Sequence, residues 1–329
     1  MAATVPASGG EGEVVGNQEI ESLIESLPKL PFLVEGHIYK YDGFWYIEDH
    51  LRAVLSCKKH FRFEDSDILL ATFPKCGTTW LMAILYAIIN RHRYPIGSED
   101  HPLLTNNPHS LVRNFELNLY NKNAIPDLSN MPAPRLFATH APALSLCDEV
   151  KNNSGCKVVY VCRNPKDSVV SFWHFLGKLK PEAASRLSFD EFFDSFCSGV
   201  ITFGLFWDHV VDHWKASLSM PEKVMFLSYE QIIEQPDHYV KKMAEFMGCP
   251  FSSVEEDEGV VNGIVKMCSF SHLSQLEVNK SGRTQNGVRH DSFFRRGVVG
   301  DSKNLLSSEM INKIDRITEE KFSPHGLTI

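Results

Sequence analysis

The sequence predicts an α/β fold, in which a single domain is built on a central, mostly parallel sheet flanked by helices. Four short runs are rich in apolar and β-branched residues, and each is bounded by turn residues or followed by a helical stretch. The expected strands are residues 67–72, 135–139, 157–162 and 223–228. Strands that alternate with helices are typical of a parallel sheet covered on both faces. With 329 residues, of which 43% are hydrophobic, the chain can also bury a full core.

Helices are expected along most of the remaining chain. Apolar patterning predicts them at residues 20–27, 48–61, 165–177, 188–198, 203–219, 230–247, 255–268 and 307–322. The aromatic, turn-bearing segment 38–46 is suited to a hairpin or to the lining of an apolar pocket. Residues 1–17 have the composition of a disordered tail, so the expected folded domain is residues 18–329.

The overall charge and composition exclude several classes of protein. A net charge of −8 without a polybasic run argues against a protein that binds nucleic acids or anionic membranes. The longest apolar run, residues 80–89, is far shorter than the roughly 20 residues of a membrane span. The eight cysteines form no C-x-x-C pair, and the first 16 residues lack the features of a signal peptide. These observations predict a cytoplasmic protein, and no ligand pattern indicates a metal.

The stretch that organises the site joins the first expected strand to a buried helix at residues 81–89. In order it contains Lys75, Cys76, Gly77, Thr78, Thr79 and Trp80. A helix N-terminus presents unpaired N–H groups and the positive end of its dipole, so this arrangement is a P-loop-like anion site. Gly77 lets the backbone approach the ligand, and Lys75 adds a cation. Because the lysine precedes the glycine, the order differs from a Walker A motif. Alone, the stretch also fits a tight turn with an exposed lysine.

A second basic residue follows the third expected strand. Arg163 stands at the strand end, Asn164 and Pro165 are suited to begin a helix, and Ser171 lies about two turns into that helix. Taken alone, these residues would fit a surface arginine and an unrelated serine on the helix face better than a binding site. Because ligands of doubly wound folds collect at the carboxyl ends of strands, two such sites in one sheet favour a shared anionic ligand.

A histidine and a basic segment complete the candidate site. His140 follows the second expected strand, where it would emerge at the same edge of the sheet as Lys75 and Arg163. A histidine in that position can accept a proton near neutral pH, although a single histidine is more often structural. Residues 279–303 are polar and rich in glycine and basic residues, and we expect this segment, called the lid below, to be a long functional loop.

Four separated motifs, in this order, resemble those of the cytosolic sulfotransferases, and most of all the plant branch of that family. They are T-F-P-K-C-G-T-T-W at 72–80, T-H at 139–140, V-C-R-N-P-K-D at 161–167 and F-F-R-R-G-V-V-G-D at 293–301. The resemblance extends from about residue 30 to the C-terminus. It implies transfer of a sulfuryl group from 3′-phosphoadenosine 5′-phosphosulfate (PAPS) to a hydroxyl of a small acceptor, without a metal.

The resemblance also implies roles for the residues that match these motifs. Residues 75–80 would form the phosphosulfate-binding loop, with Lys75 neutralising the leaving phosphate and Trp80 stacking on adenine. His140 would take the acceptor's proton. Two further residues, Tyr229 and Phe270, would position the adenine. The 3′-phosphate would be held by Arg163 and Ser171 and, from the lid, by Arg295, Arg296 and Gly297.

Two departures from the family pattern leave alternatives open. Ala138 stands where many animal members have a lysine, and Ser302 replaces the usual lid tryptophan, whose loss could weaken lid closure. A PAPS-binding homologue with weakened turnover is therefore the second hypothesis, and a P-loop kinase is the third. The lysine-before-glycine order and the second anion site count against the kinase.

The sequence leaves the identity of the acceptor open. Candidates are a flavonoid or other phenolic, a steroid-like alcohol or a jasmonate-like alcohol, and the oligomeric state is not predicted. Aromatic side chains that could line its pocket, or else belong to the core, are Phe44, Trp45, Tyr94, Phe115, Trp173, Phe175 and Phe206.

Overall fold

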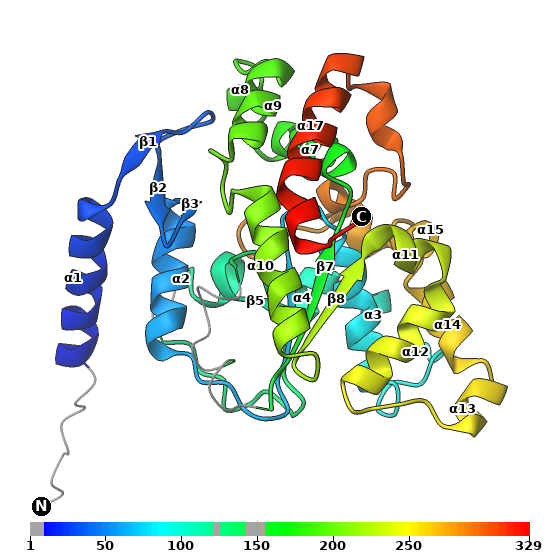
Figure 1. The fold of residues 1–329 in the computed structure, drawn as a ribbon. Coiled ribbons are helices and arrows are strands. Elements are labelled where there is room, and N and C mark those ends of the chain that lie inside the picture. Colours follow the sequence, from blue (N-terminus) through cyan, green and yellow to red (C-terminus); the bar gives the residue numbers. More distant parts are fainter. Residues whose placement is uncertain (1–9, 122–124, 143–149, 151–154) are drawn as a thin grey trace, which may run out of the picture.

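A five-stranded parallel sheet lies at the centre of the protein, in a computed structural model that describes residues 10–121, 125–142, 150 and 155–329 (Figure 1). The strands follow the order β5-β6-β4-β7-β8, and every neighbouring pair is parallel. Their bounds are β4 Ile68–Thr72, β5 Arg113–Asn114, β6 Leu136–Thr139, β7 Lys157–Cys162 and β8 Val224–Ser228. All four predicted strands are present, and the predicted α/β fold is confirmed. The sequence missed only the two-residue edge strand β5 among the strands of this sheet.

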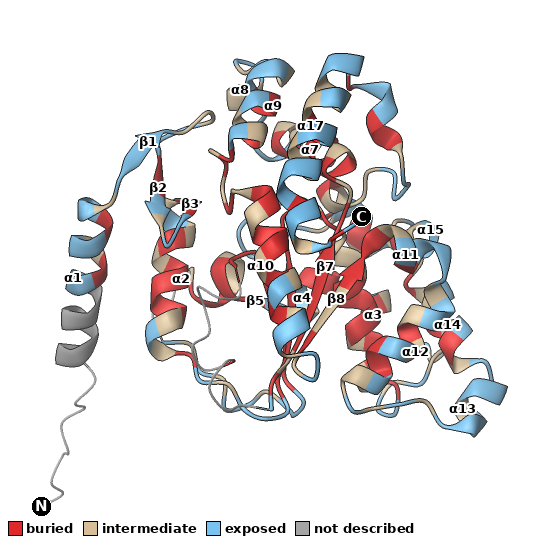
Figure 2. Ribbon diagram, in the orientation of Figure 1, coloured by how far each residue is buried: buried red, intermediate tan, exposed pale blue. Residues whose placement is uncertain are grey.

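The sheet separates two hydrophobic cores. Successive residues of β4 alternate between them: Leu69 packs in one cluster of buried side chains, whereas Ile68 and Leu70 pack in the other. Side chains of successive strand residues point to opposite faces, so a continuously apolar strand such as Ile68–Thr72 requires cover on both sides. Figure 2 shows the buried residues concentrated in the central strands and in the faces of the surrounding helices that pack on them.

Helices supply that cover, and their outer faces are exposed. The longer ones are α1 Gly10–Ser26, α2 Glu48–His60, α3 Thr78–Asn90, α7 Pro165–Leu179, α9 Phe189–Ser198, α10 Phe206–Ser219, α12 Pro236–Phe246, α14 Val260–Met267 and α17 Ser308–Phe322. The shorter ones are η1 Pro102–Leu104, α4 Pro108–Leu111, η2 Phe115–Leu119, α8 Pro181–Ala184, α11 Tyr229–Glu234, α13 Ser253–Asp257, α15 Phe270–Leu273, α16 Glu277–Ser281, η3 His290–Phe293, η4 Asp301–Asn304 and η5 Ser323–His325. Among the described residues, no helix combines the length and apolar character needed to cross a membrane.

A small antiparallel sheet lies beside the main one. It consists of β1 Lys29–Pro31, β2 His37–Tyr41 and β3 Phe44–Ile47, and β2 and β3 form the hairpin that the aromatic segment 38–46 predicted. The Trp45 amide donates a hydrogen bond to the carbonyl of Gly204, and the Phe203 amide donates to the carbonyl of Trp45. The hairpin is thereby tied to the segment that precedes α10.

Several helix boundaries differ from the prediction. The segment 230–247 is two helices, α11 and α12, because Pro236 lacks the N–H that would continue a single helix. The segment 255–268 is likewise divided into α13 and α14 at Gly259, whose φ is +74°. The first helix begins at Gly10 and so includes residues that composition assigned to a disordered tail, while residues 1–9 lie outside the described part.

The parallel register brings the carboxyl ends of four strands to one edge of the sheet. Ala71 of β4 is paired with Thr139 of β6, Thr72 with Val161 of β7, and Cys162 with Ser228 of β8. The segments that follow these strands therefore start side by side. This edge is where the sequence placed its candidate residues.

Candidate active site at the carboxyl edge of the sheet

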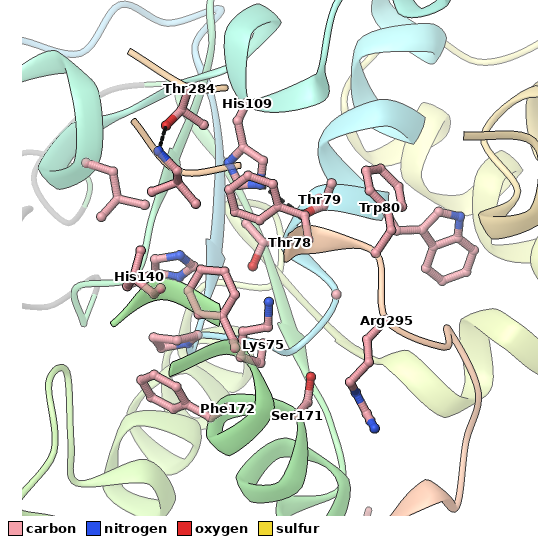
Figure 3. Close-up of a pocket in the computed structure, with 18 of the residues that line it drawn as sticks. Lys75, Thr78, Thr79, Trp80, His109, His140, Ser171, Phe172, Thr284 and Arg295 are labelled. Carbon is pink, nitrogen blue, oxygen red and sulfur yellow. Dashed lines mark hydrogen bonds between the residues drawn. The ribbon is translucent and has the colours of Figure 1, made fainter. Parts of the chain in front are cut away.

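A cavity of about 820 Å³ opens at this edge, and it collects the predicted site residues. Figure 3 shows Lys75 between His140 on one side and Ser171 and Arg295 on the other. Every predicted site residue except Cys76 lines the cavity: Lys75, Gly77, Thr78, Thr79, Trp80, His140, Arg163, Ser171, Tyr229, Phe270, Arg295, Arg296 and Gly297. The two predicted anion sites and the histidine thus share one cavity.

The turn between β4 and α3 depends on backbone conformations that few residues adopt. Lys75 has φ +70°, and Gly77, the N-cap residue just before α3, has φ +99°. A Cβ atom on Gly77 would lie 2.7 Å from Cδ2 of Tyr229, so the site needs glycine for space as well as for conformation. The Cys76 side chain is buried and lies 3.5 Å from the Ser168 hydroxyl rather than in the cavity.

Lys75 is held against aromatic rings. Its Nζ atom lies 3.8 Å from the ring centroid of Phe175 and 5.8 Å from that of Phe293. Burial, followed by the nearby cations Arg163, Lys178 and Arg295, lowers the pKa of Lys75 to about 7. An anion in the cavity would reverse this effect, because an opposite charge favours the charged amine.

Two arginines line the cavity, and each has a hydrogen-bond donor without an acceptor among the described residues. Arg163 donates from Nη2 to the carbonyl of Val298 at 2.9 Å and to Asp167 at 3.3 Å, and Arg295 pairs with Asp301. Within the described part of the chain, Nε of Arg163 and Nε of Arg295 are buried without a partner. Buried donors without acceptors are uncommon, so this pair indicates an anionic ligand between β7 and the lid.

His140 is fixed in one orientation by the strand beside it. Its Nδ1 atom lies 2.9 Å from the carbonyl oxygen of Thr72, and because a carbonyl only accepts, Nδ1 carries the proton. Burial is the main cause that lowers the pKa of His140 to about 4. The neutral ring therefore keeps the lone pair of its other nitrogen, Nε2, free of a proton.

Aromatic residues form the wall nearest α3. Trp80 and Tyr229 meet edge to face, with ring centroids 5.5 Å apart, and the guanidinium of Arg163 lies 4.7 Å from the Tyr229 ring. Gly297 of the lid has φ +65°, and a Cβ atom there would come within 2.5 Å of the Phe270 ring. The lid therefore packs directly on Phe270.

Among the residues that the structure places in or against the site and that sequence reasoning missed are two histidines and two acidic residues. His109 lies 2.8 Å from the Thr79 hydroxyl, and buried Glu116 accepts hydrogen bonds from the Thr139 hydroxyl and the backbone N–H of His140. The other two are His50, which lines the cavity, and Asp167, which contacts the lid. Only Asp167 had a signal in the sequence, since it stands one helical turn after Arg163 inside the V-C-R-N-P-K-D motif.

The structure decides between pocket and core for the aromatic residues that the sequence left open. Of that set only Phe175 lines the cavity, whereas Phe44, Trp45, Phe115 and Phe206 are buried in the core. The cavity instead takes Phe172, Phe203 and Phe293. Among the described residues, no group of three or more His, Cys, Asp or Glu side chains is arranged to hold a metal ion.

Comparison with known proteins agrees with this site. Residues 65–326 match the family model of the sulfotransferase domain. Cytosolic sulfotransferase 5 of Arabidopsis thaliana is 46% identical over 312 residues, which cover 94% of this chain and 96% of the relative. Cytosolic sulfotransferase 12 of the same plant is 44% identical over 326 residues, covering 99% and 98%. The chain therefore belongs to the sulfotransferase family and is an enzyme of that family.

Solved structures share the fold. A crystal structure of a candidate steroid sulphotransferase from Arabidopsis thaliana superposes with a TM-score of 0.76 at 40% identity, covering 99% of this chain and 100% of that one. A mouse sulfotransferase complexed with PAP superposes with a TM-score of 0.64 at 23% identity, covering 86% and 93%. The resemblance to the plant cytosolic sulfotransferases that the sequence motifs indicated is confirmed.

Proposed function

We propose that this protein transfers the sulfuryl group of PAPS to the hydroxyl of a small phenolic acceptor, with His140 as the general base. The observation that carries the proposal is the convergence of Lys75, Arg163 and Arg295 with a neutral histidine in one cavity. In the reaction, the acceptor oxygen bonds to sulfur as the bond from sulfur to the 5′-phosphate oxygen breaks. Alignment and charge stabilisation are what such a transfer requires.

The cationic side chains fit the two anionic ends of PAPS. Lys75 and the N-terminus of α3 would hold the phosphosulfate and stabilise negative charge on the departing phosphate. Arg163 and Arg295, whose Nε donors have no partner in the described protein, would receive the 3′-phosphate together with Ser171. The solved mouse relative is complexed with PAP, which supports this assignment.

The remaining nucleotide contacts follow from the walls of the cavity. Trp80, Tyr229 and Phe270 would enclose the adenine, and Arg296 and Gly297 would close the lid above the 3′-phosphate. The backbone turn of Gly77 to Thr79 would approach the phosphosulfate, and Cys76 would contribute no side-chain contact because its thiol faces the core.

His140 has the protonation state that a base needs. With Nδ1–H donated to the Thr72 carbonyl, Nε2 can accept the proton of an acceptor hydroxyl. A pKa of about 4 in the ligand-free protein keeps the ring neutral at physiological pH, and the imidazolium that forms would be stabilised by the nearby sulfate being transferred.

The acceptor end of the cavity favours a flat phenolic. Phe172, Phe203 and Phe293 supply aromatic surface there. His50 adds a neutral polar group: its ring stacks on Phe203 with centroids 5.0 Å apart, and its Nδ1 lies 3.2 Å from the Thr202 hydroxyl. A flavonoid would match both the aromatic walls and this polar pair.

A steroid-like alcohol is the second candidate acceptor. The observation that favours it is the 40% identity to a solved Arabidopsis protein described as a candidate steroid sulphotransferase. The relatives at about 45% identity are named cytosolic enzymes, and we propose the cytosol as the location of this protein as well.

The test is an acceptor screen with PAPS. Purified protein would be incubated with flavonoids, simple phenols, hydroxysteroids and hydroxylated jasmonates, and products would be identified by the mass of one added sulfuryl group. The proposal is supported if phenolic acceptors are sulfated with a higher kcat/KM than the other classes. Exclusive sulfation of hydroxysteroids supports the second candidate. Binding of PAP without turnover on any acceptor would instead support a binding protein with weakened catalysis.

A further inference from the structure

The lid is fastened to the main domain through one buried carboxylate. Asp167 on α7 is 2% exposed. Its Oδ2 atom accepts a hydrogen bond from the backbone N–H of Gly300 at 2.7 Å, and its Oδ1 atom accepts one from the backbone N–H of Ser302 at 3.0 Å. Both donors belong to the lid, more than 130 residues further along the chain.

The same carboxylate is joined to the arginine of the second anion site. Nη2 of Arg163 lies 3.3 Å from Oδ2 of Asp167 and also donates to the carbonyl of Val298 at 2.9 Å. Three lid residues are therefore hydrogen-bonded to this pair, Val298 to Arg163 and both Gly300 and Ser302 to Asp167. The guanidinium is held with its Nε free, and Nε of Arg295, which lines the same cavity, also has no partner in the described protein.

The lid turn is shaped for this contact. Gly300 has φ +79°, and this left-handed conformation allows the N–H groups of residues 300 and 302 to converge on one acceptor. Asp301, between them, points elsewhere and pairs with Arg295 and Arg296. Asp301 thus orients the lid arginines, while Asp167 holds the backbone on either side of Asp301.

We propose that Asp167 is the positioning residue that holds the lid closed over the nucleotide and orients Arg163 toward the 3′-phosphate. Lid closure then depends on backbone N–H groups and not on the side chain at residue 302. This explains how the lid packs against α7 although Ser302 replaces a large aromatic residue. The inference rests on the proposed PAPS site, and its test separates the two.

Affinity for PAP is the first measurement. Asp167→Asn keeps the shape of the side chain but removes the charge and turns an N–H group toward the lid donors. We expect the Kd for PAP, measured by calorimetry, to rise about 10- to 100-fold, as is typical when hydrogen bonds to a charged group are lost. The KM for PAPS should rise more than kcat falls, and Asp167→Glu should restore part of the affinity.

A matched control is available beside the same helix. Asp315 on α17 is exposed and pairs with Lys166 of α7 at 2.6 Å. Asp315→Asn removes the same charge near α7 without touching the lid, and it should leave the Kd for PAP within twofold of the wild-type value. An equal Kd for Asp167→Asn and wild type would overturn the inference.

Hydrogen exchange of the wild-type protein tests the contact without any variant. The amides of Gly300 and Ser302 should exchange slowly in the absence of nucleotide, and in Asp167→Asn they should exchange rapidly while the core strands stay protected. If these amides exchange in the wild type as fast as unstructured peptide, the inference is wrong even when Asp167→Asn cannot be folded. If wild-type protein does not bind PAP at all, the proposed function fails, whereas slow exchange would still support the contact.

Discussion

The strength of PAP binding should depend on pH through Lys75. Without ligand, burial and the neighbouring cations lower the pKa of this amine to about 7. An anion beside the amine raises its pKa again toward the ordinary value of about 10.4. Well below pH 7 the amine carries its proton in both the free and the bound protein, so Lys75 adds no pH dependence there. Above pH 7 binding requires proton uptake, and affinity falls.

The size of the effect follows from the fraction of Lys75 that is charged. With a pKa of about 7, about half of the amines are charged at pH 7 and about 1 in 100 at pH 9. The Kd for PAP should therefore rise about 50-fold between these pH values, which corresponds to about 2.3 kcal/mol. The 3′- and 5′-phosphates of PAP do not interfere between pH 7 and 9, because their second ionisation, near pH 6, is nearly complete at pH 7.

Isothermal titration calorimetry of PAP binding between pH 6 and 9 measures this directly. Repeating the titrations in buffers of different ionisation enthalpy should show uptake of nearly one proton at pH 8 to 9, where the phosphates are fully ionised and the free amine is not charged. Lys75→Arg is the control, because a guanidinium stays charged over this range and its Kd should be independent of pH. A wild-type Kd that changes less than threefold, or an equal slope in Lys75→Arg, would refute the reasoning.

Three further predictions concern catalysis, the binding loop and stability. His140→Ala should lower kcat by about 10²- to 10⁴-fold and leave the Kd for PAP within about twofold, since the base acts only on the acceptor; single-turnover kinetics and calorimetry measure the two effects. Gly77→Ala should weaken PAP binding by at least about tenfold, because the added Cβ would lie 2.7 Å from the Tyr229 ring at φ +99°. Asp67→Ala should lower the free energy of unfolding by about 3 kcal/mol in urea titrations, because the buried guanidinium of Arg135 loses the buried carboxylate that it contacts at 2.6 and 2.7 Å and keeps only the exposed carboxylate of Glu64 at 2.8 Å.

Each of these predictions has its own control. Unchanged turnover in His140→Ala would remove the histidine from its proposed role. For the binding loop, Gly177→Ala places a methyl group in open space within α7 and should leave PAP binding unchanged, so equal losses in both variants would argue against the contact with Tyr229. For the ion pair, adding Arg135→Met to Asp67→Ala should recover part of the lost stability, and a further loss would show that the buried charge of Arg135 without Asp67 is not the cause.

The residues at the ends of the strands could be assigned from the sequence because the signals are local. A run of β-branched and apolar residues predicts a strand, and the turn residues after it mark its carboxyl end. In a parallel sheet all such ends meet at one edge, so Lys75, His140 and Arg163 could be expected together before any contact was known. The structure places all three in the same cavity.

Contacts between segments far apart in the chain were decided by the tertiary structure. The tautomer of His140 depends on the Thr72 carbonyl, 68 residues away in sequence, and the lid is held by Asp167 across 133 and 135 residues. No local pattern encodes these partners, because they depend on which strands are neighbours and how the lid folds back. The division of aromatic side chains between core and cavity had the same origin: a phenylalanine is apolar in either place, and only packing decided that Phe175 lines the cavity while Phe206 is buried.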